Sequence, residues 1–249
     1  MNIGSLNTPF IYRGEELIYP NYVKDGLVLH YDFSAMSNDD VSRGVAKDLS
    51  GNGNHGTLQN FNFTAESGYD KNKLLFDGVD DYIVSPGRFD NIYTQEVTAT
   101  FTRNDEMYST LSATLNHRKG EESGFAVTIA LGDRIRINLG TGAGLSVNSL
   151  SNTGVNIGDK FHVVAVVDSL MLKVYINGVF NQEFKLLSFD PIQKEATGFY
   201  VGRYGTSYDF YKAKGNIFST KAYNRPLTPE EIAHNYAIEK ERFNIGGGE

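Results

Sequence analysis

The chain has 249 residues and a formal net charge of −7, and it contains no cysteine. The acidic balance argues against nucleic acid or an acidic membrane surface as the main partner, and the missing cysteines exclude disulfides and thiolate chemistry. No apolar run is long enough for a transmembrane helix. Tyrosine, phenylalanine and glycine are plentiful while tryptophan is absent, which favours an all-β chain with many turns.

Three segments are predicted. Residues 1–25 form an N-terminal arm, because they contain two prolines and show no regular periodicity. This arm either lies on the domain or is an attachment segment that becomes ordered on a partner. It has neither the basic n-region nor the apolar h-region of a secretory signal. Residues 26–240 are expected to form one domain, and residues 241–249 a flexible tail.

Most of the domain is predicted to be β-structure. Residues 26–33, GLVLHYDF, alternate with a period of two, which is typical of a strand. Further along the chain, SGFAVTIAL and DRIRINLG predict a hairpin through Gly132 and Asp133. Residues 160–184 predict an antiparallel meander that turns at Asn177-Gly178, since both residues accept the positive φ of a type I′ turn. The other expected strands are LLFDGVDDYIV (two strands around an acidic turn), EVTATFT, FYVGRY and NIFSTKAYN.

One helix is predicted, over LTPEEIAHNYAIEKER. Thr228 can cap it, Pro229 fits the first helical position, and Glu231 completes a capping box. Ile232 and Tyr236 share one face, which is expected to dock on the sheets.

The glycine-rich stretch GNGNHG, residues 51–56, formally matches the dinucleotide-binding pattern G-x-G-x-x-G. That pattern binds pyrophosphate only where it connects a buried strand to a helix. Polar residues precede this stretch and no helical periodicity follows it. We therefore predict no nucleotide cofactor here and interpret the glycines as turn formers in a surface loop.

Several blocks of sequence occur in a recognisable order: GLVLHYDFS, DLSGNGNHGTL, LLFDGVDDYIV, FHVVAVVDSLMLKVYINGVF, FYVGR and AYNRPLTPEEIAHNY. Together they resemble the laminin-G-like, concanavalin A-like jelly-roll family over about residues 26–238. Phe161 stands where that family usually has tryptophan, so a sugar-stacking role at this position is in doubt. The resemblance implies an all-β fold, a two-sheet antiparallel jelly-roll sandwich, with one short C-terminal helix.

Acidic residues provide a candidate metal site. Asp77, Asp80 and Asp81 crowd one turn and Asp48 precedes the glycine loop. Oxygen-rich clusters suit Ca²⁺, and members of the similar family often bind it at the rim of the sandwich. The alternative is that these residues accept backbone hydrogen bonds in turns.

Aromatic and basic residues provide a candidate ligand site. Arg203, Tyr204, Tyr208 and Tyr211 lie in one short stretch, and His117 lies in another predicted loop. Tyrosine rings stack on sugars while arginine donates to hydroxyls. The alternative is that several of these tyrosines belong to the core. No run of acidic residues resembles the catalytic pattern of concanavalin A-like glucanases, so no catalytic residue is predicted.

Three functions remain open: a non-enzymatic glycan-recognition module, a structural decoration or assembly protein, and a glycan-degrading enzyme of this fold. We combine the first two. A chain that begins without a secretion signal and resembles short phage proteins is expected to be a bacteriophage virion component, a tail or capsid accessory protein made in the host cytoplasm. Its expected partners are bacterial surface glycan and, through residues 1–25, other virion proteins, in a homo-oligomer.

Overall fold

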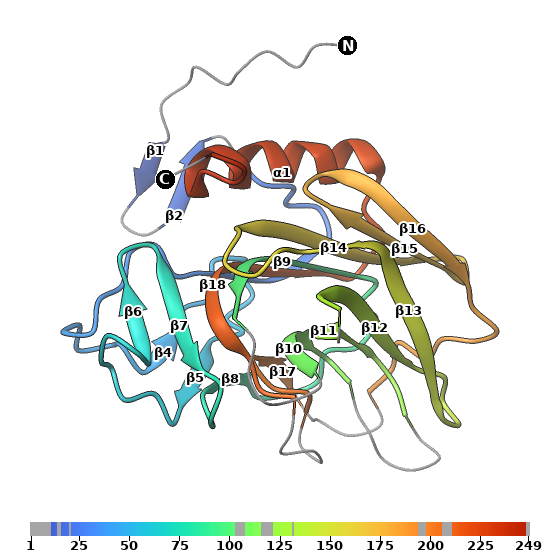
Figure 1. Ribbon diagram of the computed structural model, residues 1–249, viewed down its shortest axis with the longest axis horizontal. Coiled ribbons are helices and arrows are strands. Elements are labelled where there is room, and N and C mark those ends of the chain that lie inside the picture. Colours follow the sequence, from blue (N-terminus) through green and yellow to red (C-terminus); the bar gives the residue numbers. More distant parts are fainter. Residues whose placement is uncertain are drawn as a thin grey trace.

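The computed structural model describes residues 11–13, 16–19, 21–102, 108–115, 122–130, 132–193, 198–205 and 211–247. Two antiparallel sheets pack face to face, and helix α1 (Pro229–Phe243) lies across the outer face of one of them (Figure 1). We call the sheet beneath α1 the upper sheet and the other the lower sheet. This arrangement confirms the predicted two-sheet jelly-roll sandwich with one C-terminal helix.

Within each sheet, the spatial order of the strands differs from their order in the sequence. The upper sheet contains β16 (Val179–Lys185), β15 (Met171–Ile176), β14 (Phe161–Asp168), β9 (Thr94–Phe101), β18 (Lys214–Tyr223), β7 (Lys73–Asp77) and β6 (Gly68–Asp70), with β3 (Leu27–Asp32) also paired to β18. The lower sheet contains β13 (Leu145–Gly154), β12 (Arg134–Gly140), β11 (Phe125–Ala130), β10 (Tyr108–Ala113), β17 (Phe199–Val201), β8 (Tyr82–Ser85), β5 (Gly56–Gln59) and β4 (Val45–Ala46). A separate hairpin joins β1 (Ile11–Arg13) to β2 (Glu16–Tyr19).

The core between the sheets follows from side-chain alternation. In β3, Leu29 and Tyr31 belong to the main hydrophobic cluster, whereas His30 and Asp32 occupy the alternate positions. Strand β14 differs because both of its faces are buried: Val163 packs in the core while Val164 belongs to a second cluster with Ile232 of α1. A continuous apolar run is the expected sequence of such a strand.

The predicted turns are present. Asn177 and Gly178 have φ values of 52° and 72°, and they join β15 to β16. Glycine is required at the second position because a Cβ there would lie 2.4 Å from Cδ1 of Tyr236 on α1. Gly132 and Asp133 likewise have positive φ between β11 and β12.

Helix α1 begins as predicted, with both hydrogen bonds of the capping box between Thr228 and Glu231. Its buried side chains are Ile232, Asn235, Ile238, Glu239 and Phe243, so the docked face is partly polar, while Tyr236 stays partly exposed. No helix in the described part of the chain is both long and apolar enough to cross a lipid bilayer.

A charged network fills the space between α1 and the upper sheet. Nζ of Lys221 on β18 lies 3.0 Å from Oε1 of Glu96 on β9 and 2.6 Å from Oε1 of Glu239 on α1. All three side chains are fully buried. The remaining oxygens are also satisfied, because Asn235 donates to Glu96 and Ser219 donates to Glu239. The network therefore attaches the helix to two strands of the sheet.

A second ion pair extends this network to the N-terminal side of the domain. Nη1 of Arg242 lies 2.6 Å from Oδ2 of Asp32, and the same nitrogen donates to the hydroxyl of Tyr22 at 2.7 Å. Lys221 also lies over the Tyr22 ring, 3.9 Å from its centroid. The last residues of the segment expected to be an arm thus pack beneath α1.

We predict that Lys221→Met destabilises the protein by about 3 to 5 kcal/mol, because it leaves two buried carboxylates without their cation. The matched control is Lys173→Met, which removes a partly exposed pair with Asp168 and should cost about 0 to 1 kcal/mol. Urea unfolding of both variants measures the difference. Equal losses in the two would contradict a stabilising role for the buried network.

Ionisation in this region makes stability depend on pH. Burial and the nearby Lys221 charge lower the pKa of His30 from 6.5 to about 3. Burial alone would raise the pKa of Glu96, but Lys221 and a contact with His162 outweigh it and lower that pKa to about 2. Both shifts mean that the unfolded chain binds protons at a higher pH than the folded protein does.

The His30 shift predicts that the free energy of unfolding falls as pH decreases from about 6.5 towards about 3. His30→Phe should make the free energy of unfolding depend less on pH, at pH values above those at which carboxylates titrate. Phenylalanine can take the same place because neither ring nitrogen of His30 has a hydrogen-bond partner in the described part of the chain, and the ring packs edge-on against Tyr22. Denaturant unfolding at a series of pH values tests this, and equal slopes for both proteins would contradict it.

Candidate functional site

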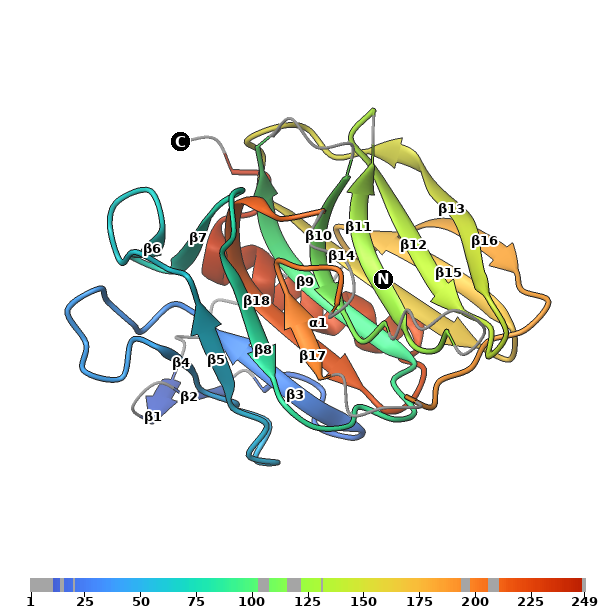
Figure 2. The same cartoon turned by 90° about the horizontal axis from the view of Figure 1, so that it is seen from below.

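The outer face of the lower sheet carries the aromatic residues of the candidate site. Figure 2 looks onto this sheet, with α1 behind it. In β17, Phe199 and Val201 point into the core, so Tyr200 between them points outward. The same alternation places Ile83 of β8 inside and Tyr82 outside.

Five tyrosines form a connected group on this face, which we call the tyrosine row. Tyr82 lies beside Tyr200, with ring centroids 6.2 Å apart. Tyr200 packs in the same cluster as Tyr204, whose ring meets Tyr211 edge-on at 5.2 Å. Tyr211 then meets Tyr108 of β10 edge-on at 4.7 Å. The row therefore crosses the sheet from β8 to β10.

The members of the tyrosine row differ in exposure. Tyr200 and Tyr204 are only 6% and 4% exposed, so they support their neighbours rather than offering a free ring face. Tyr82, Tyr108 and Tyr211 are half-buried and keep part of their rings accessible. The rings are held at fixed angles, with Tyr211 nearly perpendicular to Tyr108, so a ligand would meet each of the three accessible rings separately.

An arginine lies over each end of the tyrosine row. The guanidinium of Arg203 is 4.7 Å from the centroid of Tyr82, and that of Arg136 on β12 is 4.3 Å from the centroid of Tyr108. Nε of Arg136 donates to Oδ1 of Asn138 at 3.0 Å, which fixes the plane of the group. Both contacts are within the usual range of cation–π interactions.

The structure brings together three of the residues predicted to bind a ligand: Arg203, Tyr204 and Tyr211. Tyr208 and His117 lie outside the described residues. Sequence reasoning missed Tyr82, Tyr108, Tyr200 and Arg136, because they come from strands far apart in the chain. Their signal was the period of two, which places Tyr82 and Tyr200 opposite to their buried neighbours.

The glycine-rich loop has a structural role in which Asp48 is central. Its carboxylate accepts hydrogen bonds from the backbone of His30, Ser50 and Asn54 and from the Ser50 hydroxyl. Four bonds use about all the lone-pair positions of a carboxylate. Asn52 and Asn54 donate to carbonyls at the start of β3. The loop thus closes on β3, and Asp48 lies outside the other acidic group.

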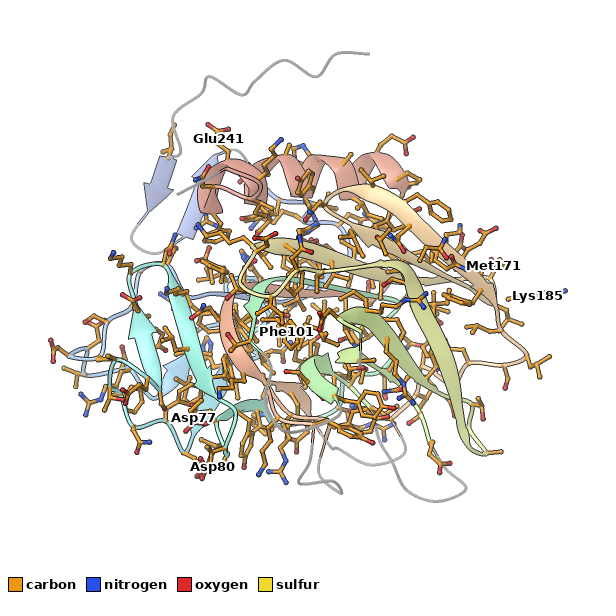
Figure 3. All side chains as sticks on the ribbon, viewed as in Figure 1. Asp77, Asp80, Phe101, Met171, Lys185 and Glu241 are labelled. Carbon is orange, nitrogen blue, oxygen red and sulfur yellow. The ribbon has the colours of Figure 1, made fainter. Side chains whose placement is uncertain are left out.

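The remaining predicted metal ligands do meet. One carboxylate oxygen from each of Asp77, Asp80 and Asp81 lies within 4.8 Å of the others, in the turn between β7 and β8. Figure 3 shows Asp77 and Asp80 together at one end of the molecule. Burial raises the pKa of Asp81 to about 6, although bonds from the Asp77 backbone and Ser67 partly offset it. Three such oxygens fit a calcium ion that completes its shell with carbonyls or water.

If these residues hold Ca²⁺, millimolar calcium should raise the melting temperature at pH 7.5, by about 2 to 4 °C for each kcal/mol of binding free energy. The rise should shrink at pH 5, where Asp81 is protonated and binds metal poorly. Asp81→Asn should abolish it and the surface variant Asp168→Asn should not. An unchanged melting curve with calcium and with chelator would reject the metal site.

A groove of about 690 Å³ lies where the β13–β14 connection meets the end of α1, lined by residues 154–161, Ile176 and Asn177, and by Asn244, Gly246 and Gly247. Its single aromatic lining residue, Phe161, is 2% exposed. The groove therefore has no accessible ring for stacking on a sugar.

The sequence profile of the concanavalin A-like lectin/glucanases superfamily matches residues 77–233. The chain belongs to this superfamily. A comparison with curated protein sequences gave no match.

Solved structures share the fold. A Trypanosoma rangeli sialidase in complex with sialic acid aligns with a TM-score of 0.59 and 20% identity, covering 89% of this chain and 34% of that one. The chain thus spans about a third of that sialidase. Domain 4 of AbnA, a GH43 extracellular arabinanase from Geobacillus stearothermophilus, in complex with arabinotriose, aligns at 0.59 and 19% identity, covering 85% and 98%. The CBM40 of Ruminococcus gnavus IT-sialidase, bound to sialyllactose, aligns at 0.50 and 15%, covering 67% and 97%.

Proposed function

We propose that this protein is a glycan-recognition module that binds an oligosaccharide along the tyrosine row. The observation that carries the proposal is the row itself, with three partly exposed rings held in place by two buried ones. The apolar faces of sugar rings stack on such surfaces, and phenol and guanidinium groups bond to the hydroxyls around them. The fold-sharing domains in complex with arabinotriose and sialyllactose agree with this class of ligand.

We further propose that the glycan is bound without being cleaved. Glycoside hydrolysis usually requires two carboxyl groups on either side of the bond that breaks. The outward positions described for β8, β10, β11, β12 and β17 carry no carboxyl group. Their residues are tyrosine, valine, threonine, alanine, arginine, asparagine and glycine. The fully buried Glu96 and Glu239 instead lie between α1 and the upper sheet, on the other side of the sandwich.

The biological setting that we propose is a bacteriophage particle that contacts bacterial surface glycan. It rests on the resemblance of the sequence to short phage proteins, and attachment through residues 1–25 stays a prediction. Weak single sites repeated on an oligomeric particle would gain avidity, which suits a module with one shallow aromatic face.

An array of bacterial and other glycans tests the function. We predict selective binding that Tyr82→Ala and Tyr108→Ala each weaken by roughly threefold to tenfold, as expected for the loss of one stacked ring. The matched control is Phe180→Ala, because Phe180 is a half-exposed aromatic residue on β16 of the upper sheet. All variants must keep the melting temperature of the parent protein.

Two results would contradict the proposal. The first is a folded protein that binds no glycan on the array, and the second is equal weakening by Phe180→Ala. Incubation of the protein with the glycan that it binds tests the absence of cleavage, since shorter products would reveal an enzyme.

A further inference from the structure

We propose that the tyrosine row selects glycans that carry carboxylate groups, and that Arg136 recognises one of these carboxylates. This inference rests on the proposed function and adds the chemical class of the ligand. It follows from the unused donors of Arg136 and from its place at the end of the row.

Arg136 is oriented but not neutralised. Its Nε donates a hydrogen bond to Asn138, and its guanidinium group lies over the Tyr108 ring. These two contacts fix the position and the orientation of the guanidinium group. Its terminal nitrogens, Nη1 and Nη2, make no hydrogen bond or ion pair with the described residues. These two nitrogens form a planar fork that matches both oxygens of a carboxylate.

The support around Arg136 makes this fork rigid. Asn138 is 3% exposed, and Thr128, which pairs with Arg136 on the neighbouring strand, is fully buried. The Thr128 hydroxyl donates to the Arg136 carbonyl at 3.0 Å, which holds the backbone at this position. A guanidinium that is already ordered loses little side-chain entropy when it binds.

Arg203 lies over the other end of the row, above Tyr82. The two rings beneath these guanidinium groups belong to β10 and β8, which are two strand spacings apart in the sheet, or about 10 Å. An oligosaccharide of a few sugars that lies across the strands therefore passes from one arginine to the other. A repeating acidic glycan would place negative groups near both ends while its rings cover the tyrosines.

The charge of the whole protein does not oppose this recognition strongly. The net charge is −7, but exposed charges farther away than about 8 Å are largely screened at physiological salt. The short-range contact with Arg136 then decides whether a carboxylate is bound at this place.

The experiment uses the full chain and an array of matched glycans: uronate and sialate oligosaccharides, their carboxyl methyl esters, neutral analogues of the same linkage, and sulfated analogues. We expect the carboxylates to bind best and their methyl esters to bind roughly tenfold or more weakly, because the ester removes the charge and keeps the ring. Arg136→Gln should weaken carboxylate binding to a similar degree and leave binding of the ester unchanged.

Two further variants separate geometry from charge. Arg136→Lys keeps the positive charge and loses the fork, so we expect it to recover only part of the affinity lost in Arg136→Gln. Lys185→Gln makes the same change of charge at an exposed site on the edge strand of the upper sheet (Figure 3), and it should bind like the parent protein.

Each other outcome overturns the inference in a distinct way. Preferential binding of neutral glycans, weakened by Tyr82→Ala but not by Arg136→Gln, would reject the carboxylate and retain the proposed function. Preference for sulfated over carboxylated glycans would likewise reject it. No binding to any glycan would reject both proposals together.

Discussion

The structure depends on the buried ion cluster in which Lys221 lies between Glu96 and Glu239. Burying three charges is unfavourable unless each is paired and hydrogen-bonded, so the cluster is stable only when α1 and the strands β9 and β18 are correctly docked. A purely apolar contact tolerates sliding, whereas this cluster fixes one position of the helix along the sheet. Arg242 and Asp32 extend the same constraint to β3 and to Tyr22.

Because of this constraint, the outer faces of the two sheets differ in the residues that they carry. The outer face of the upper sheet is occupied by α1 and its charged network, and is therefore committed to stability. The outer face of the lower sheet has the partly exposed Tyr82, Tyr108 and Arg136 at outward positions of its strands, and Arg203 and Tyr211 join them from the segments beside β17 and β18. A rigid sheet is a good support for recognition, because ring orientations are set by the strands before a ligand arrives.

The glycine-rich loop and the acidic turn illustrate two uses of carboxylates at the rim. Asp48 is saturated by hydrogen bonds within its own loop, which closes the sequence GNGNHG against β3. Asp81 is also buried and accepts hydrogen bonds from the Ser67 hydroxyl and the Asp77 backbone, but it lies near two other acids, and burial raises its pKa. Similar local sequences, rich in aspartate and glycine, therefore give one isolated structural carboxylate and one group of three acids, for which a cation site stays a prediction.

The sequence alone determined the turn at Asn177-Gly178, the capping box of α1 and the grouping of Asp77, Asp80 and Asp81, because each depends on residues that are close in the chain. The β-sandwich class was predicted from the order of several sequence blocks that resemble a known family. The tertiary structure decided which tyrosines form one surface, since Tyr82, Tyr108 and Tyr200 come from separate strands brought together by the order of the lower sheet. The tertiary structure also decided that the side chains of Asn235 and Glu239 are buried between α1 and the upper sheet. Amphipathic periodicity marks only apolar positions as buried, and a charged residue becomes a buried one only when its partner, here Lys221, is supplied by a distant strand.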